Sequence, residues 1–235
     1  MSDRLPIAET FCSIQGEGKL TGVPSFFVRI SGCNLRCRWC DTPYASWSPE
    51  SEPRSIEALV REALSSGLGH VVLTGGEPLL FDAVVPLCDR LRAHGLHVTI
   101  ETAGTVAPDI RCDLMSISPK LSNSTPTNDP RDPGGGWARR HERTRINLGS
   151  LRRLIDCGLD RQLKFVVCDP GDLDEIDALL AQLPPACARD VMLMPEGITP
   201  PGRAMKAWVA EVCMARGWRY CPRLHIELFG NARGT

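Results

Sequence analysis

The sequence alternates between short apolar runs and amphipathic stretches, and this rhythm is the feature that most constrains its fold. Apolar runs with the β-branched and aromatic residues typical of strands cover residues 25–30, 70–74, 96–101, 113–118, 162–167 and 191–195. Apolar residues at helical spacing cover residues 55–66, 80–94, 148–158, 171–183 and 201–216, and residues 218–222 are a candidate last strand. Strands that alternate with helices pair in parallel through helical crossovers.

We therefore expect one α/β domain over residues 1–235. A closed barrel of eight strands and eight helices usually takes about 250 residues. The alternation thus predicts a smaller version, an open, partial parallel β/α barrel of about six strands.

Charge and composition exclude several classes of protein. The chain has 27 basic and 28 acidic residues, so its overall charge gives no reason to expect direct binding to nucleic acid or to an anionic membrane. No apolar run approaches the ~20 residues that span a bilayer, and the first residues lack the apolar core of a signal peptide. We expect a cytoplasmic protein, in which the eleven cysteines are reduced thiols.

Residues 122–146 depart from this alternation of strands and helices, because they combine Pro, Gly and Asn with a basic run. Such a composition is typical of a solvated, flexible surface loop. The alternative is a lid that orders over a substrate. The arginines of this stretch could meet an anion, although the sequence does not require one; they are Arg139, Arg140, Arg143 and Arg145.

The sharpest motif directly follows the first apolar strand. Cys33, Cys37 and Cys40 lie within eight residues, so one loop can bind one metal centre. Structural zinc normally takes four protein ligands, and electron-carrying 4Fe–4S clusters normally take four cysteines. A nearby fourth cysteine is missing, which favours a cluster with an open coordination position. A zinc site completed by a distant residue, or a set of buried structural thiols, remains an alternative.

Polar motifs follow four of the other expected strands. Since the carboxyl ends of parallel strands share one rim, we expect these motifs to meet there. They are Thr74-Gly75-Gly76-Glu77-Pro78, Glu101-Thr102-Ala103-Gly104, Ser118-Pro119-Lys120 and Met194-Pro195-Glu196-Gly197.

The spacing Cys-x-x-x-Cys-x-x-Cys resembles the signature of the radical S-adenosylmethionine (SAM) superfamily. The resemblance implies a 4Fe–4S cluster on Cys33, Cys37 and Cys40, whose open iron binds SAM. It also implies that SAM is cleaved to methionine and a 5′-deoxyadenosyl radical, which abstracts a hydrogen atom from the substrate. The residues expected near SAM are Trp39, Cys40, Asp41, Gly76, Glu77, Ser118, Pro119, Lys120, Met194, Pro195, Glu196 and Gly197.

Glu77 would accept a hydrogen bond from the amino group of SAM, and residues 194–197 would cradle its adenine. Ser118 and Lys120 would lie near the ribose or the carboxylate of SAM. These roles follow from the resemblance alone.

A narrower resemblance rests on residues 11–18 (FCSIQGEG) and 221–226 (CPRLHI), together with GCNLRCRWCDT, TGGEP and SPK. Over about residues 7–230 these are similar to the 7-carboxy-7-deazaguanine synthases of the queuosine and deazapurine pathway. The resemblance implies a lyase that converts 6-carboxy-5,6,7,8-tetrahydropterin to 7-carboxy-7-deazaguanine with loss of ammonia, regenerates SAM and uses Mg²⁺. The substrate-binding residues would be Ile14, Gln15, Gly16, Glu17, Arg29, Thr74 and His225, with Thr42 as the protein's ligand to Mg²⁺.

Several of these residues have chemistry that suits the role. Gln15 and Glu17 offer donors and acceptors to a pterin edge. Arg29 lies in an apolar strand, so it needs either the substrate carboxylate or a structural acidic partner. Thr42 has the alternative of being a helix N-cap. Lys164 is a candidate for the barrel interior.

The sequence departs from the family pattern at Ala103, where Asn is expected, and at Glu196, where Gln is common. It also has a long 122–146 segment and a C-terminal FGNARGT. Two other functions compete: a glycyl-radical-enzyme activase of the same superfamily, and a non-enzymatic metal or iron–sulfur module. The resemblance further implies a flavodoxin or ferredoxin as electron donor and a homodimer.

Overall fold

The computed structural model describes residues 3–157, 159–185 and 190–235. Its centre is a nine-stranded sheet in the order β3-β1-β2-β4-β5-β6-β7-β8-β9. The six expected strands are confirmed, and each pairs in parallel with the next. They are β2 (Pro24–Ile30), β4 (His70–Gly75), β5 (His97–Thr102), β6 (Leu114–Ile117), β7 (Asp160–Val167) and β8 (Val191–Pro195).

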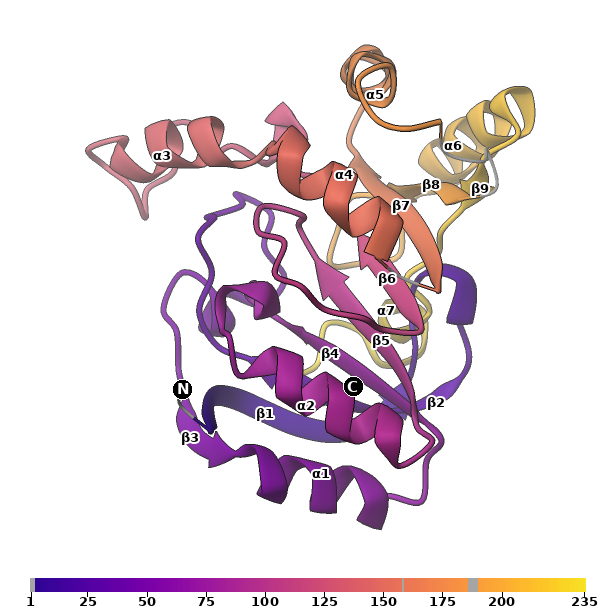
Figure 1. The fold of residues 1–235 in the computed structure, drawn as a ribbon. Coiled ribbons are helices and arrows are strands. Elements are labelled where there is room, and N and C mark those ends of the chain that lie inside the picture. The colour runs from indigo at the N-terminus through magenta and orange to yellow at the C-terminus, as the bar shows by residue number, and fades with distance from the viewer. Residues whose placement is uncertain (1–2, 158, 186–189) are drawn as a thin grey trace.

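Three further strands extend the sheet at its two edges. The short β9 (Arg219–Tyr220), expected as a last strand, pairs in parallel with β8. Beside β2 lie β1 (Arg4–Ile14) and β3 (Glu52–Ser55), in antiparallel pairs β2–β1 and β1–β3. The sheet curves but does not close, since β3 and β9 are its two edges (Figure 1). It is an open, partial β/α barrel, as expected.

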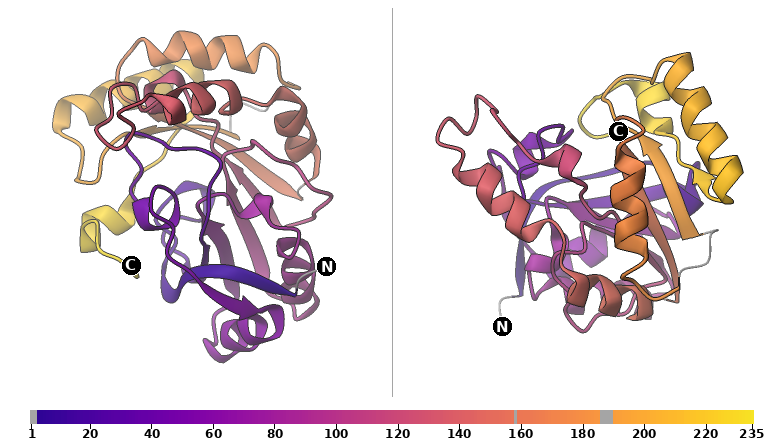
Figure 2. Two further views of the ribbon diagram at one scale, coloured as in Figure 1. Left: turned by 90° about the vertical axis from the view of Figure 1, so that its left-hand side faces the viewer. Right: turned by 90° about the horizontal axis from the view of Figure 1, so that it is seen from above.

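The expected helices are present and pack on the outer face of the curved sheet (Figures 1 and 2). Ser55 is the N-cap of the first helix, because its hydroxyl accepts the N–H of Ala58 at 3.2 Å. Gly158, expected to end the 148–158 helix, lies outside the described residues. These helices are α1 (Ile56–Ser65), α2 (Val84–Ala93), α4 (Leu148–Cys157), α5 (Asp172–Leu180) and α6 (Arg203–Arg216).

Side-chain alternation along the strands separates the core from the barrel interior. In β2, Val28 and Ile30 are fully buried against the helices, whereas Phe27 and Arg29 border an interior cavity. The same alternation turns Lys164 of β7 inward, while Phe165 joins the core. The parallel strands thus have one apolar face and one face that carries polar groups for a site.

Residues 122–146 contain regular structure rather than an irregular loop. They include a 3₁₀ turn, η4 (Ser122–Ser124), and the helix α3 (Gly136–Thr144), which stands out from the body of the molecule (Figure 1). The flexibility and the lid function of this segment stay predictions.

Within the described ranges, no helix is both long and apolar enough to cross a membrane.

Candidate active site

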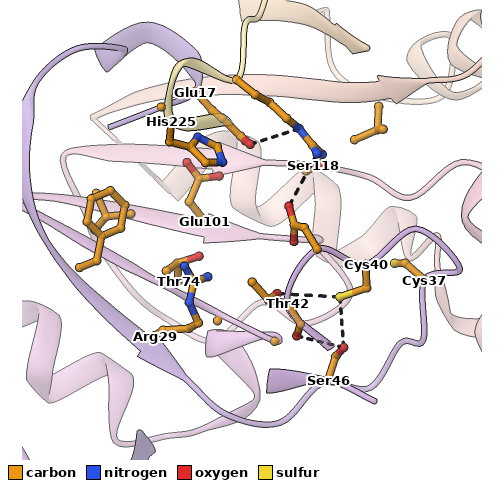
Figure 3. A pocket seen from close by; sticks show the side chains of 18 of the residues that line it. Glu17, Arg29, Cys37, Cys40, Thr42, Ser46, Thr74, Glu101, Ser118 and His225 are labelled. Carbon is orange, nitrogen blue, oxygen red and sulfur yellow. Dashed lines mark hydrogen bonds and ion pairs between the residues drawn. The ribbon is translucent and has the colours of Figure 1, made fainter. Parts of the chain in front are cut away.

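A cavity of about 440 Å³ lies at the carboxyl ends of the parallel strands and extends into the barrel interior. Figure 3 shows side chains from distant parts of the chain converging on it. Thr74 of β4, Thr102 of β5 and Ser118 after β6 reach it from the rim, and Lys164 reaches it from inside. This is the position at which parallel α/β folds build their sites.

The cysteine loop forms one wall of the cavity. Cys33, Cys37 and Cys40 all border it, and the Cys40 Sγ lies 3.1 Å from the Ser46 Oγ and 3.8 Å from the Thr42 Oγ1. Trp47 Nε1 donates to the Cys37 carbonyl at 3.0 Å. These contacts fix the loop before any metal binds.

The turn after β4 packs directly against the start of this loop. The N–H of Glu77 donates to the carbonyl of Gly32 at 2.9 Å. A Cβ at position 76 would stand 2.2 Å from the Gly32 oxygen and 2.6 Å from the Ala45 oxygen. Only glycine fits there, so the Gly-Gly-Glu motif and the cysteine loop are one structural unit.

The thiols fit a 4Fe–4S cluster. Burial raises the pKa of Cys33 to about 12, and it also raises the pKa of Cys37, so both need a bound cation to become thiolates. Among the described residues, no three His, Cys, Asp or Glu side chains close on a single metal ion. Thiolates on separate corners of a cubane stand further apart than ligands of one ion. No fourth cysteine is among the described residues that border the cavity, so the three thiols would leave one iron of such a cluster without a cysteine ligand.

A buried ionic group forms the opposite wall. Lys164, only 3% exposed, donates to Glu17 and to the Glu101 Oε2 at 3.0 Å. Gln15 Nε2 donates to the other Glu101 oxygen at 3.2 Å. Burial would raise the pKa of Glu17, but Lys164 and Arg223 outweigh it and hold this pKa at about 2. Burial would likewise lower the pKa of Lys164, but Glu101 and Glu17 raise it.

Arg29 lies between these two walls and has an acidic partner. Its Nε donates to the Glu9 Oε1 at 2.7 Å, and the same oxygen accepts the hydroxyl of Tyr44 at 2.7 Å. No hydrogen bond joins either Arg29 Nη to another described residue, and Arg29 borders the cavity next to Thr74, its neighbour in the sheet (Figure 3). The structural acidic partner that the sequence allowed for Arg29 is therefore present, and it is Glu9. A substrate carboxylate in the cavity can still bind the two Nη atoms of Arg29.

His225 lies against the turn that follows β1. A Cβ at Gly16 would stand 1.9 Å from the His225 Nδ1, so the imidazole occupies the space that glycine leaves. Leu224 N donates to the Gly16 carbonyl at 2.9 Å. Burial lowers the pKa of His225, so the ring is neutral near pH 7 and one nitrogen can accept a hydrogen bond.

Arg223 is a site residue that sequence reasoning did not select. Its Nη1 donates to the Gly197 carbonyl at 2.5 Å, its Nε lies 3.6 Å from the Glu17 Oε1, and its Nη1 lies 3.8 Å from the Asp41 Oδ2. One side chain thus links three walls of the cavity. The signal was present in the CPRLHI motif, where only His225 was chosen.

Other side chains around the cavity were also missed as site residues. Glu101 appeared in a motif without a role, and nothing in the sequence selected Tyr44 or Arg233, which border the cavity beside Arg29. Arg233 donates to the Glu9 Oε2 at 3.2 Å and therefore joins the same group of charges.

All the expected substrate residues border the cavity, as do most of those expected near SAM. Lys120 donates to the carbonyl and the hydroxyl of Ser118 at 2.9 and 2.8 Å, and its Nζ lies 5.8 Å from the centre of the Trp39 ring. The residues that the structure brings together are Ile14, Gln15, Gly16, Glu17, Arg29, Cys33, Cys37, Trp39, Cys40, Asp41, Thr42, Thr74, Gly76, Ser118, Lys120, Met194 and His225.

Glu77, expected near SAM, is not among the residues that border the cavity. Its carboxylate is fully buried away from the cavity, where it accepts the Thr102 hydroxyl at 2.8 Å and the Ala103 N–H at 2.8 Å. With these partners it joins the ends of β4 and β5, and its contact with the amino group of SAM stays a prediction. Four other residues expected near SAM also do not border the cavity: Pro119, Pro195, Glu196 and Gly197. The carbonyl of Gly197 accepts a hydrogen bond from Arg223.

Comparison with known proteins agrees with this fold and site. The family model of the radical SAM superfamily matches residues 27–183. The chain therefore belongs to the radical SAM superfamily, and the arrangement of three cysteines on an open barrel is typical of that class.

More specific relatives are similar over nearly the whole chain. A 7-carboxy-7-deazaguanine synthase from Rhodopirellula baltica is 50% identical over 98% of this chain and 89% of its own length. One from Halobacterium salinarum is 50% identical over 98% and 93%. The crystal structure of QueE from Escherichia coli has a TM-score of 0.71 at 29% identity, over 94% of this chain and 95% of that chain. The chain belongs to the 7-carboxy-7-deazaguanine synthase family.

Proposed function

We propose that this chain converts 6-carboxy-5,6,7,8-tetrahydropterin to 7-carboxy-7-deazaguanine with loss of ammonia. The observation that carries the proposal is a single cavity. It joins three cysteines on one wall to Arg29 and the Glu17–Lys164–Glu101 group on the others. When bound, a 4Fe–4S cluster with SAM supplies a radical that abstracts a hydrogen atom, and SAM is regenerated.

The chain's own residues bind and orient the substrate. The carboxylate of the pterin pairs with the two free Nη atoms of Arg29, and Thr74 donates from the next strand. Gln15, Glu17 and His225 present donors and acceptors to the pterin edge. Because Lys164 and Arg223 keep Glu17 ionised, Glu17 acts as a hydrogen-bond acceptor throughout.

Three further elements belong to the proposal. Thr42, beside Cys40, offers a hydroxyl oxygen of the kind that Mg²⁺ binds, with substrate and water oxygens completing the coordination. A flavodoxin or ferredoxin supplies the electron, and the enzyme is a homodimer. The cytoplasmic location stays a prediction.

The test is turnover by anaerobically reconstituted protein with SAM, Mg²⁺, a reductant and the tetrahydropterin. We expect 7-carboxy-7-deazaguanine by mass spectrometry and ammonia in equal amount, with SAM not consumed. Cys37→Ala, which removes one cluster ligand, should abolish product formation and lower the iron content.

Two outcomes would favour the competing functions. Reductive cleavage of SAM without consumption of the pterin would favour an activase that acts on a protein. A colourless protein that binds zinc, or a cluster whose EPR spectrum does not respond to SAM, would favour a non-enzymatic module.

A further inference from the structure

The outer face of α3 is a basic surface without acidic partners. Arg139 and Arg143 are exposed and lie four residues apart, hence on one side of the helix. Arg140 is exposed on the same helix, and none of these three arginines forms an ion pair with another described residue. Figures 1 and 2 show α3 projecting from the body, so a large partner can reach this face.

Two nearby carboxylates do not neutralise this surface, because each forms an ion pair with another arginine. Glu142 pairs with Arg145 at 2.6 Å, and Asp129 pairs with Arg131 at 2.6 Å. Asp132 accepts the N–H of Ala138 at 2.8 Å, within the start of the helix. The whole chain has a formal charge of −1, so this basic surface is a local concentration of charge.

The inner face of α3 is attached to the cysteine loop. The His141 Nδ1 accepts the backbone N–H of Arg36 at 3.1 Å, and the guanidinium of Arg36 lies 4.0 Å from the centre of the Trp137 ring. Arg36 in turn donates to the carbonyl of Cys33 at 2.7 Å. The helix therefore packs on the loop that carries the cysteines, with its basic face on the opposite side of the helix.

We infer that the outer face of α3 is the docking surface for a small acidic one-electron carrier protein of the flavodoxin or ferredoxin kind. This inference rests on the proposed function, which requires a reduced cluster. One electron passes from the carrier to the cluster: the carrier is oxidised by one electron, the cluster is reduced by one, and no bond forms or breaks. An acidic protein fits the unpaired arginines by charge, and docking on α3 brings its redox centre next to the cysteine loop.

The experiment compares charge-reversed variants of the holoenzyme, with an acidic bacterial flavodoxin as the probe. Arg139→Glu/Arg143→Glu should weaken flavodoxin binding about tenfold or more at low salt and reduce the dependence of Kd on salt. Arg139→Lys/Arg143→Lys keeps the charge and should bind nearly as the wild type does. Arg90→Glu/Arg219→Glu reverses two exposed arginines on α2 and β9 and should leave Kd close to the wild-type value.

A second measurement separates docking from catalysis. With dithionite as reductant, Arg139→Glu/Arg143→Glu should cleave SAM and turn over the pterin at the wild-type rate, whereas flavodoxin-supported rates should fall. If the wild type binds flavodoxin through α3 but does not convert the pterin, the proposed function fails and the docking surface stands.

Three results would overturn the docking surface. They are an unchanged flavodoxin Kd in Arg139→Glu/Arg143→Glu, an equal loss in Arg90→Glu/Arg219→Glu, and a fall in the dithionite-supported rate as large as the fall with flavodoxin. Binding of a tRNA that the α3 reversal abolishes, with flavodoxin affinity unchanged, would assign the surface to nucleic acid instead.

Discussion

Arg29 uses one nitrogen for a contact within the protein and leaves two available to the cavity. Its Nε is bound to Glu9, while its two Nη atoms have no hydrogen-bond partner among the described residues. Glu9 also accepts from Tyr44 and Arg233, and these hydrogen bonds together with Arg29 lower its pKa although burial raises it. A planar guanidinium can serve Glu9 and a substrate carboxylate at the same time, whereas an ammonium offers one point charge.

Arg29→Lys should therefore raise the KM for the tetrahydropterin by at least about tenfold, which corresponds to about 1.4 kcal/mol of binding free energy. Steady-state kinetics with dithionite as reductant measures it. Arg54→Lys alters another arginine–glutamate pair, Arg54–Glu62, outside the cavity and should leave KM unchanged. An unchanged KM in Arg29→Lys would show that Arg29 serves Glu9 alone.

Lys164 holds two carboxylates together inside the barrel, so its loss should be costly. Lys164→Met leaves Glu17 and Glu101 buried without their cation, and removing one partner of such a buried pair destabilises a protein by about 3–5 kcal/mol. Urea unfolding of Lys164→Met should show a loss of this size, together with loss of turnover. Lys206→Met breaks a solvent-exposed pair with Glu227 and should cost about 1 kcal/mol or less. Equal losses in the two variants would contradict this account.

At the scale of elements, the tight packing of the Gly-Gly-Glu turn on the cysteine loop has a direct test. Gly76→Ala places a methyl group against two backbone oxygens that cannot rotate away, so the loop must shift. We expect destabilisation of about 1–3 kcal/mol and a lower iron and sulfide content after reconstitution.

Gly69→Ala is the matched control, since a Cβ there meets nothing within 4 Å. Its iron content should equal that of the wild type. A normal cluster content in Gly76→Ala would mean that the loop accommodates the methyl group.

The elements that sequence predicted well are those with a regular apolar period. The six parallel strands are buried on both faces or nearly so, and their apolar runs identify them. β1 was missed because its residues are mostly half-buried and it contains Pro6, so its pattern is weak. β3 has four residues, including Pro53, at a sheet edge. α3 was hidden by the Pro- and Gly-rich residues before it and by its arginines, which do not resemble a helix packed on a core.

For the whole molecule, two buried histidines predict how stability depends on pH. Burial lowers the pKa of His70 to about 4 and that of His141 to about 4, from an ordinary value of 6.5. Between pH 6.5 and about 4 the unfolded chain binds protons that the folded chain does not. The free energy of unfolding should therefore fall as the pH is lowered through this window.

Urea unfolding at several values from about pH 7 to about pH 4 measures the dependence. His70→Gln removes one of the two groups, so its stability should change less with pH than that of the wild type. His94→Gln, on the exposed C-cap of α2, should keep the wild-type dependence. A His70→Gln curve parallel to the wild type would exclude His70 as a source.

The site residues could be predicted where one short segment of sequence contains all the residues that carry the chemistry. The cysteine loop and the residues Gln15, Glu17 and Thr74 border the cavity as expected. The motif does not indicate that the Glu77 carboxylate also has protein partners, Thr102 and Ala103, which join the ends of β4 and β5. Arg223 and the Glu9–Arg29 pair depend on contacts between distant segments, which no local pattern contains.

Arg223 links Glu17 and Asp41, which lie in the first third of the chain, to Gly197, which like Arg223 lies in the last third. A nascent polypeptide that ends after β7 already contains the three cysteines, Glu17 and Lys164. It does not yet contain Arg223, which forms the link, or Gly197, to whose carbonyl Arg223 donates. The link between the cysteine loop and the far wall of the cavity therefore cannot form until the C-terminal segment that carries Arg223 has been synthesised.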